Sequence, residues 1–149
     1  MISKITVLSF NKPAPRWQAL LDTYQKRFDR HRFEHIVIKE KGDSREATRK
    51  NASAEVAKKV PPAAKLIILD ERGRGYNSQQ FAALLSAEQN QHVCLVIGSS
   101  YGLELDKLPP HILLKMSDFV LAHDVARILL FEQLYRAVAI LDNHPYHHE

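Results

Sequence analysis

Short apolar runs alternate with longer segments of helical spacing along the chain. Residues 2–10 and 33–39 are rich in β-forming side chains, and both predict strands. Residues 65–70 and 93–97 are apolar without alternation, which predicts strands buried on both faces, as in a parallel sheet. We expect a last short strand at residues 117–121, directly before the final helical segment.

Helical segments separate these strands. Asp43 and Glu46 resemble a capping box that opens a helix ending near Val60, and Ser78 is expected to cap the next helix. An earlier helix follows from apolar positions at helical spacing, which are Trp17, Leu20, Leu21, Tyr24 and Phe28. Strands that alternate with helices predict the α/β class, with a mostly parallel sheet in a single domain of residues 1–149.

The final helical segment, residues 124–141, is apolar around nearly its whole circumference. Asp124 is expected to cap it, and Glu132 precedes Arg136 at the favourable i,i+4 spacing. The apolar residues are Val125, Ile128, Leu129, Leu130, Phe131, Leu134, Val138, Ile140 and Leu141. Such a helix needs cover on both sides, and a small domain covers one. We therefore expect the other side to contact a second copy of the chain.

The net charge of +4 is distributed unevenly. Residues 1–65 hold 15 Lys and Arg against 7 Asp and Glu, whereas residues 66–149 hold 6 against 10. Basic runs lie at residues 26–32 and 45–50. A basic face attracts phosphates without reading sequence, which suggests an RNA partner. The solvated faces of two amphipathic helices explain the same charges, so the pattern alone leaves both interpretations open.

Several classes of protein are not supported by the sequence. No apolar run reaches the roughly 18–20 residues that a membrane span needs, and the first ten residues lack a signal-peptide cleavage pattern. The single cysteine, Cys94, excludes an internal disulfide framework, fits the cytoplasm and is expected to be buried. The phosphate-loop, dinucleotide-binding and H-E-x-x-H patterns are absent.

Residues 98–102 satisfy the G-x-S-x-G pattern of an esterase, with Ser100 as the nucleophile. The remaining partners would be Asp118 or Asp124 and His144 or His147. The pattern needs a helix directly after it, but Pro109 and Pro110 arrive within seven residues. A loop bounded by glycines, which lets a ligand approach the backbone closely, explains these residues better.

A polar tail, residues 142–149, follows the last helix. His144, His147 and His148 could ligate zinc, although no cysteine or carboxylate ligand set accompanies them. A disordered terminus is the other interpretation. Pro145 and Tyr146 favour order, because an aromatic side chain in a tail usually packs on something.

Four ordered segments carry a family resemblance that spans the whole chain. They are LDERGRGYNSQQFA (69–82), VIGSSYGL (96–103), the segment ending LAH (121–123), and LYRA (134–137) followed by NHPYH (143–147). In order and spacing these segments resemble the RlmH family, SPOUT-class methyltransferases that act on a pseudouridine of 23S ribosomal RNA. The resemblance implies a trefoil knot in the C-terminal third of the chain, an exception to the rule that chains do not thread loops.

The resemblance also implies S-adenosylmethionine as cofactor, bound by backbone of the knot loops. Carried over by position, the contacts are Leu69, Gly98, Met116, Ser117, Asp118, Phe119, Val120 and Leu121. Two positions depart from the family pattern. Ser99 stands where a second glycine is common, and Ala122 stands where a proline is common. The serine narrows backbone freedom, while its small size still permits close approach.

The implied reaction is attack of a pseudouridine N3 on the sulfonium methyl, with the enzyme holding both in line. His147 is the expected general base, and Arg136 is expected to stabilise negative charge on the nucleobase. Tyr146 would stack on the base or hydrogen-bond to it, and Glu149 would orient a histidine or act as base.

The implied partners are a second copy of the chain, which completes the site, and 23S ribosomal RNA on the assembled ribosome. Neither a membrane nor DNA is implied, and the expected location is the cytoplasm. A non-catalytic dimer that binds RNA or ribosomes on the same fold is the alternative. Charge reversal at Arg27, Arg30 and Arg32 is predicted to weaken ribosome binding.

Overall fold

The computed structural model describes residues 2–29, 32–88 and 91–147. Within these ranges the chain forms one five-stranded sheet of order β2-β1-β4-β3-β5, in which every neighbouring pair is parallel. The strands are β1 (Ile2–Phe10), β2 (Phe33–Ile38), β3 (Lys65–Gly75), β4 (Gln91–Ile97) and β5 (Ile112–Lys115). The predicted α/β class with a parallel sheet is therefore confirmed.

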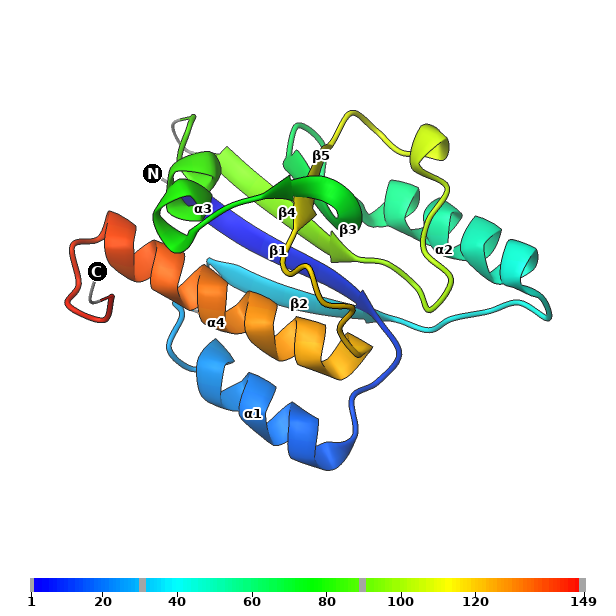
Figure 1. Ribbon diagram of the computed structural model, residues 1–149, viewed down its shortest axis with the longest axis horizontal. Coiled ribbons are helices and arrows are strands. Elements are labelled where there is room, and N and C mark those ends of the chain that lie inside the picture. Colours follow the sequence, from blue (N-terminus) through cyan, green and yellow to red (C-terminus); the bar gives the residue numbers. More distant parts are fainter. Residues whose placement is uncertain (1, 30–31, 89–90, 148–149) are drawn as a thin grey trace.

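Helices cover both faces of this sheet (Figure 1). They are α1 (Pro15–Gln25), α2 (Arg45–Lys59), α3 (Ser78–Leu85) and α4 (His123–Leu141), with a short 3₁₀ helix η1 (Leu105–Lys107). Helices α1, α3 and α4 pack on one face, where Leu21, Phe81 and Phe131 join one core cluster. Helix α2 packs on the other face, where Val56 joins a second cluster.

The strands without polar alternation contribute side chains to both clusters. Leu95 of β4 and Ile67 of β3 enter the cluster under α4, while their neighbours Val96 and Ile68 enter the cluster under α2. Cys94 is fully buried, and burial raises the pKa of its thiol to about 12. Burial on both faces is what unalternating runs predict for a central parallel strand.

Beyond Leu69, strand β3 crosses directly over the edge strand. Its pairing with β5 shifts register between Leu69 and Arg74. A Cβ at Gly73 would lie 2.5 Å from the carbonyl carbon of Leu113. Only glycine allows two backbones to approach so closely, so Gly73 is required for this crossing.

Two helices begin one residue away from the predicted cap. Ser44, rather than Asp43, caps α2, because its extended backbone aims Oγ at the amide of Ala47, 3.0 Å away. Asn77, rather than Ser78, caps α3 and forms a reciprocal capping box with Gln80.

The prediction of a strand at residues 117–121 is wrong, because the last strand of the described residues is β5, which begins five residues earlier, at Ile112. Ser117 Oγ accepts a hydrogen bond from the amide of Phe119 at 2.9 Å, which closes a local turn instead. The cap expected at Asp124 is also wrong. Helix α4 begins at His123 after Ala122, which makes no side-chain cap, and Asp124 lies within the first turn.

Candidate functional site

Three loops converge at the carboxyl edge of the sheet. Leu69 of β3 pairs with Ile97 of β4 and with Leu114 of β5. Gly98 directly follows Ile97, and Met116 follows Leu114 by two residues, so the first residues of all three expected cofactor segments lie side by side. Ligands of parallel α/β sheets bind at this edge, outside the carboxyl ends of the strands.

Asp70 directly follows Leu69 within β3, where the register of the pairing with β5 shifts. The carboxylate of Asp70 accepts hydrogen bonds from the amide, Nε and Nη2 of Arg72, each at 2.8 Å. This hydrogen bonding holds the pKa of Asp70 below its usual range. The carboxylate of Asp70 is therefore held in place next to Leu69, an expected cofactor contact.

The loop from Gly98 to Gly102 closes on itself. Ser99 Oγ donates to the carbonyl of Gly102 at 2.7 Å and accepts from the amide of Tyr101 at 3.3 Å. Among the described residues, the non-glycine positions with positive φ do not include Ser99. The second family glycine is thus not needed for backbone conformation here, and the serine hydroxyl closes the turn.

Ser100 is not arranged as a nucleophile. Its amide and Oγ both donate to Glu40 Oε1, at 2.6 and 2.9 Å. A turn and then the three-residue η1 follow it, instead of the helix that an esterase needs. The esterase interpretation is therefore wrong, and Glu40 instead ties this loop to the end of β2.

The segment Met116–Leu121 exposes large apolar side chains. Phe119 is 84% and Val120 90% exposed, and Lys115 pairs with Asp118 at 2.6 Å. Exposed apolar groups of this size mark a ligand or partner contact. Together with Leu69 and the tight backbone position Gly98, they suit a cofactor whose adenine is recognised by apolar contact and backbone. A Cβ at Gly98 would lie 3.2 Å from Leu103 Cγ.

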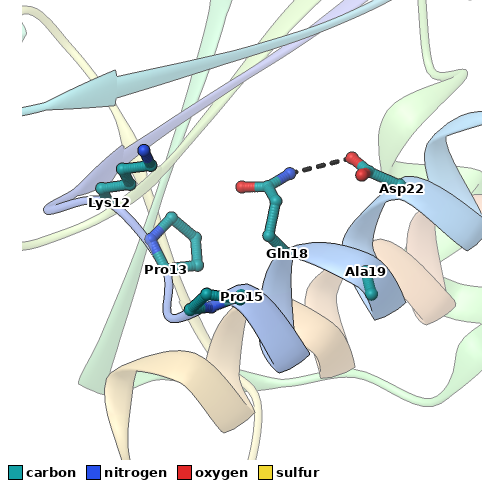
Figure 2. Close-up of a pocket in the computed structure, with 6 residues that line it drawn as sticks. All are labelled: Lys12, Pro13, Pro15, Gln18, Ala19 and Asp22. Carbon is teal, nitrogen blue, oxygen red and sulfur yellow. Dashed lines mark hydrogen bonds between the residues drawn. The ribbon is translucent and has the colours of Figure 1, made fainter.

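Two hollows lie near this edge. A cavity of about 300 Å³ between α3 and α4 adjoins the segment at Met116, but neither Leu69 nor Gly98 lines it. A wider, open hollow of about 580 Å³ lies along α1 (Figure 2), where Gln18 Nε2 donates to Asp22 at 2.9 Å. Neither hollow is lined by the predicted catalytic residues Arg136, Tyr146 and His147.

Those catalytic residues gather instead at the other end of α4, around Glu132. Glu132 Oε1 accepts from Arg136 Nε at 2.9 Å, and Oε2 accepts from the Tyr146 hydroxyl at 2.8 Å. The bond to Glu132 raises the pKa of Tyr146, which keeps its proton on the phenol. It also raises the pKa of Arg136. The tail therefore packs on α4 as far as His147, while His148 and Glu149 lie outside the described residues.

The ring of His147 is held in a defined state. Arg136 Nη1 lies 3.0 Å from His147 Nδ1, and a guanidinium can only donate, so Nδ1 accepts. A neutral His147 then carries its proton on Nε2. To act as a base through Nδ1, His147 must first release Arg136.

Three residues of this cluster were not predicted as site residues. Arg27 lies over the rings of Tyr24, Tyr135 and Tyr146, at 5.1, 5.3 and 6.0 Å from their centroids. Tyr135 packs edge-on against Tyr146, with centroids 4.8 Å apart. Glu132 did give a signal, its i,i+4 spacing to Arg136, but that spacing was interpreted only as support for the helix. Nothing local in the sequence connects Arg27 to the tail.

The cluster of predicted catalytic residues and the expected cofactor segments lie at opposite ends of α4. Helix α4 starts beside the end of β1, where the amide of Phe10 donates to His123 Nε2. Its 19 residues span roughly 28 Å. It ends beside the start of β2, where Phe28 packs against both Phe33 and Tyr135. In Figure 1 the segment that follows α4 accordingly lies far from the end of β4.

A buried polar cluster anchors the start of α4. Arg127, only 2% exposed, donates through Nη2 to the carbonyls of Phe10 and Asn11, while Nε and Nη1 make no hydrogen bond. A hydrogen bond of 2.7 Å joins Ser9 Oγ and His35 Nε2. Burial, and then the charge of Arg127, lowers the pKa of His35 to about 4 and also lowers that of His123. The histidine of the LAH segment is therefore a neutral anchor of the fold.

In the part of the chain that the structure describes, no group of three His, Cys, Asp or Glu side chains is placed to hold a metal ion. His144 is exposed, and its amide donates to the carbonyl of Ala139. None of the described helices combines the length and apolarity that crossing a membrane requires.

Comparison with known proteins agrees with the segments identified above. The family described as "Predicted SPOUT methyltransferase" matches residues 3–147. A protein of Neisseria gonorrhoeae named ribosomal RNA large subunit methyltransferase H is 38% identical, over 97% of this chain and 99% of its own length. Proteins of the same name from Laribacter hongkongensis and Chromobacterium violaceum are 41% and 38% identical, over 98% of this chain and 99% of their own length. The chain thus belongs to the SPOUT methyltransferase family.

Proposed function

We propose that this protein transfers a methyl group from S-adenosylmethionine to N3 of a pseudouridine in 23S ribosomal RNA. The observation that carries the proposal is the match, over nearly the whole chain, to relatives named ribosomal RNA large subunit methyltransferase H. The RlmH resemblance supplies the finer part, the pseudouridine and its N3. A ribosomal substrate implies that the protein works in the cytoplasm.

The donor is held at the carboxyl edge of the sheet. Leu69, Gly98 and the segment Met116–Leu121 contact it, with the exposed Phe119 and Val120 offering apolar surface. When bound there, S-adenosylmethionine supplies an electrophilic methyl group on a sulfonium. The chain's own part is to hold that methyl in line with the attacking nitrogen.

The active enzyme is a homodimer in which each site is shared. One chain holds its tail at the far end of α4 from its own donor segments, so the tail of a second chain must complete the site. The geometry supports this, because α4 keeps apolar side chains partly open to solvent. Val125 is 39% exposed, and Ile128, Leu129 and Ile140 are half-buried. These residues offer the second copy an apolar surface.

The tail residues act on the nucleobase. Arg136 faces the base edge and stabilises the negative charge that develops when N3 loses its proton. Tyr146, whose single hydroxyl proton is donated to Glu132, stacks on the base or accepts a hydrogen bond from it at the hydroxyl oxygen. His147 accepts the N3 proton at Nδ1 once Arg136 has moved from that nitrogen to the base. Glu149 remains a predicted partner of the histidine.

The alternative is a dimer that binds ribosomes without catalysis. The two departures from the family pattern, Ser99 and Ala122, make this alternative conceivable. At Ser99 the self-closed loop gives no reason to exclude the donor. Calorimetry with S-adenosylmethionine separates the two functions. A saturable site is expected for the methyltransferase and none for the binding protein.

The proposed function is tested by methyl transfer from a labelled donor into purified ribosomes that lack the modification. The account predicts label in 23S RNA, mapped to one pseudouridine and resistant to further modification at N3. Absence of label in ribosomes, in separate large subunits and in free 23S RNA would reject the proposal.

A further inference from the structure

The molecule presents a basic and aromatic face beside the donor loop. It consists of Lys39, Lys41, Arg45, Arg49 and Tyr101, all of which are exposed. We propose that this basic–aromatic face is where ribosomal RNA lies against the enzyme, with Tyr101 as a stacking platform for an unpaired base. The inference rests on the proposed function and adds the surface that recognises its substrate.

The cations of the face are available to phosphates. Among the ion pairs of the described residues, none involves Lys39, Lys41, Arg45 or Arg49. The acidic residues in the same stretch are Glu40, Asp43 and Glu46. Residues 39–50 hold five Lys and Arg against these three carboxylates, so positive charge predominates in the stretch beside the donor loop. Unpaired cations on a fixed surface are what a nucleic-acid backbone recognises.

Tyr101 has the features of a base-stacking platform. Its side chain is 46% exposed, and the guanidinium of Arg45 lies 5.4 Å from its ring centroid. One part of the ring is thus supported by a cation while another part stays open to solvent. Aromatic rings flanked by arginine bind bases of single-stranded RNA through stacking, because every base has a π-face.

The platform is held in place before RNA arrives. Glu40 ties Ser100 to the end of β2, and the hydroxyl of Ser53 on α2 accepts from the amide of Glu104 at 2.7 Å. The same hydroxyl donates to the carbonyl of Arg49 at 2.7 Å. The loop that carries Tyr101 is therefore fixed at both ends against α2 and β2, and little order must be gained on binding.

The position of the face suits the reaction. Tyr101 lies three residues after Gly98, which is an expected donor contact, so RNA stacked there passes the mouth of the donor site. In the other basic run, residues 26–32, the side chains of two described arginines contact groups of the protein itself. Arg27 lies over the rings of Tyr135 and Tyr146, and Arg32 Nη2 donates to the carbonyl of Ile2 at 2.9 Å. Charge reversal at Arg27 would therefore disturb the catalytic cluster as well as any RNA contact.

The experiment measures binding of the full-length protein to purified ribosomes across a range of salt concentrations. The variants are Tyr101→Ala, Tyr101→Trp and the double variant Arg45→Gln with Arg49→Gln. The matched control is Lys58→Gln with Lys59→Gln, which removes the same charge from the far end of α2. Calorimetry with S-adenosylmethionine checks that each variant retains its donor site and its fold.

In the Arg45 and Arg49 variant, loss of two phosphate contacts should make the slope of log affinity against log salt shallower by about 1.4–1.8. Tyr101→Ala should weaken binding at least about five-fold, with the slope kept, and Tyr101→Trp should restore it. The assignment of this face would be overturned if Tyr101→Ala and the double-glutamine variant both kept the parental affinity and slope. It would also be overturned if the Lys58 and Lys59 control lost as much affinity and slope as the Arg45 and Arg49 variant. If the parent protein transfers no methyl group to ribosomes, the proposed function itself fails, which is a separate result.

Discussion

A single carboxylate, Glu132, holds two of the predicted catalytic residues. One of its oxygens holds Arg136, and the other holds Tyr146, fourteen residues away. The i,i+4 pair can be predicted from the sequence because helix geometry fixes it. The return of Tyr146 onto the same carboxylate cannot, because it depends on how the chain turns after Leu141. The role of Glu132 thus became visible only in three dimensions.

Replacing Glu132 with glutamine should therefore reduce methyl transfer by about ten-fold or more, because Arg136 and Tyr146 lose a charged acceptor. Binding of S-adenosylmethionine should be unchanged, since Glu132 is not among the expected donor contacts. Glu55→Gln is the matched control, as Glu55 pairs with Lys59 at the same i,i+4 spacing away from the tail. Equal turnover of Glu132→Gln and Glu55→Gln would contradict this role.

Alanine at His147 or at Tyr146 should lower turnover on ribosomes by roughly 10²–10⁴-fold for the base and less for the tyrosine. Neither side chain belongs to the buried core, so the circular dichroism spectrum and melting temperature should stay close to the parental values. Rates are measured with saturating donor. Full turnover by a folded His147→Ala protein would remove His147 from the mechanism.

His35 should make the fold sensitive to acid. Its pKa in the folded chain is about 4, whereas an unfolded histidine titrates near 6.5, so the unfolded chain binds more protons between these values. The free energy of unfolding should then fall as the pH drops from about 6.5 to about 4, by up to about 3 kcal/mol from this residue. His35→Gln should flatten part of that dependence in urea titrations. The same substitution at the more accessible His92 is the control. Identical pH profiles for the parent and His35→Gln would show that His35 is not the source of the acid sensitivity.

At the scale of elements, the sequence predicts the buried strands. It does not predict where helices and strands end, because the ends depend on neighbouring side chains. The apolar runs of β3 and β4 identify buried parallel strands, because both of their faces are covered. Ends are less predictable. Asn77 caps α3 because Gln80 reciprocates, and residues 117–121 leave the sheet because Ser117 closes a turn that exposes Phe119. The pairing of β5 with β3 is a long-range contact that no local pattern encodes.

The exposed segment between β5 and α4 should be needed for the donor and not for the fold. Phe119→Ser and Val120→Ser are expected to change the free energy of unfolding by no more than about 0.5 kcal/mol, because both side chains are almost fully exposed. Affinity for S-adenosylmethionine should fall several-fold in calorimetry. Leu20→Ser on α1, also an exposed apolar position, should leave that affinity unchanged. Donor affinity equal to the parent in both loop variants would exclude the segment from the site.

At the scale of the whole molecule, the parallel sheet places every expected donor contact at one edge, and α4 carries the catalytic tail to the other. The resemblance predicts which residues take part, and the sequence predicts the helix, but only the structure shows that α4 runs roughly 28 Å from the end of β1 to the start of β2. One chain cannot close this distance, which is why the account requires a dimer. The trefoil knot implied by the resemblance stays a prediction.

The most direct test of this shared site is complementation between two inactive variants. Gly98→Val disables the donor end, where a side chain would press on Leu103, and His147→Ala disables the catalytic end. Each variant alone should fail to methylate ribosomes. Co-expressed in equal amounts, they form mixed dimers with one intact site, so about a quarter of the parental activity should return. Activity that stays at the level of the separate variants, although mixed dimers form, would contradict a site built from two chains.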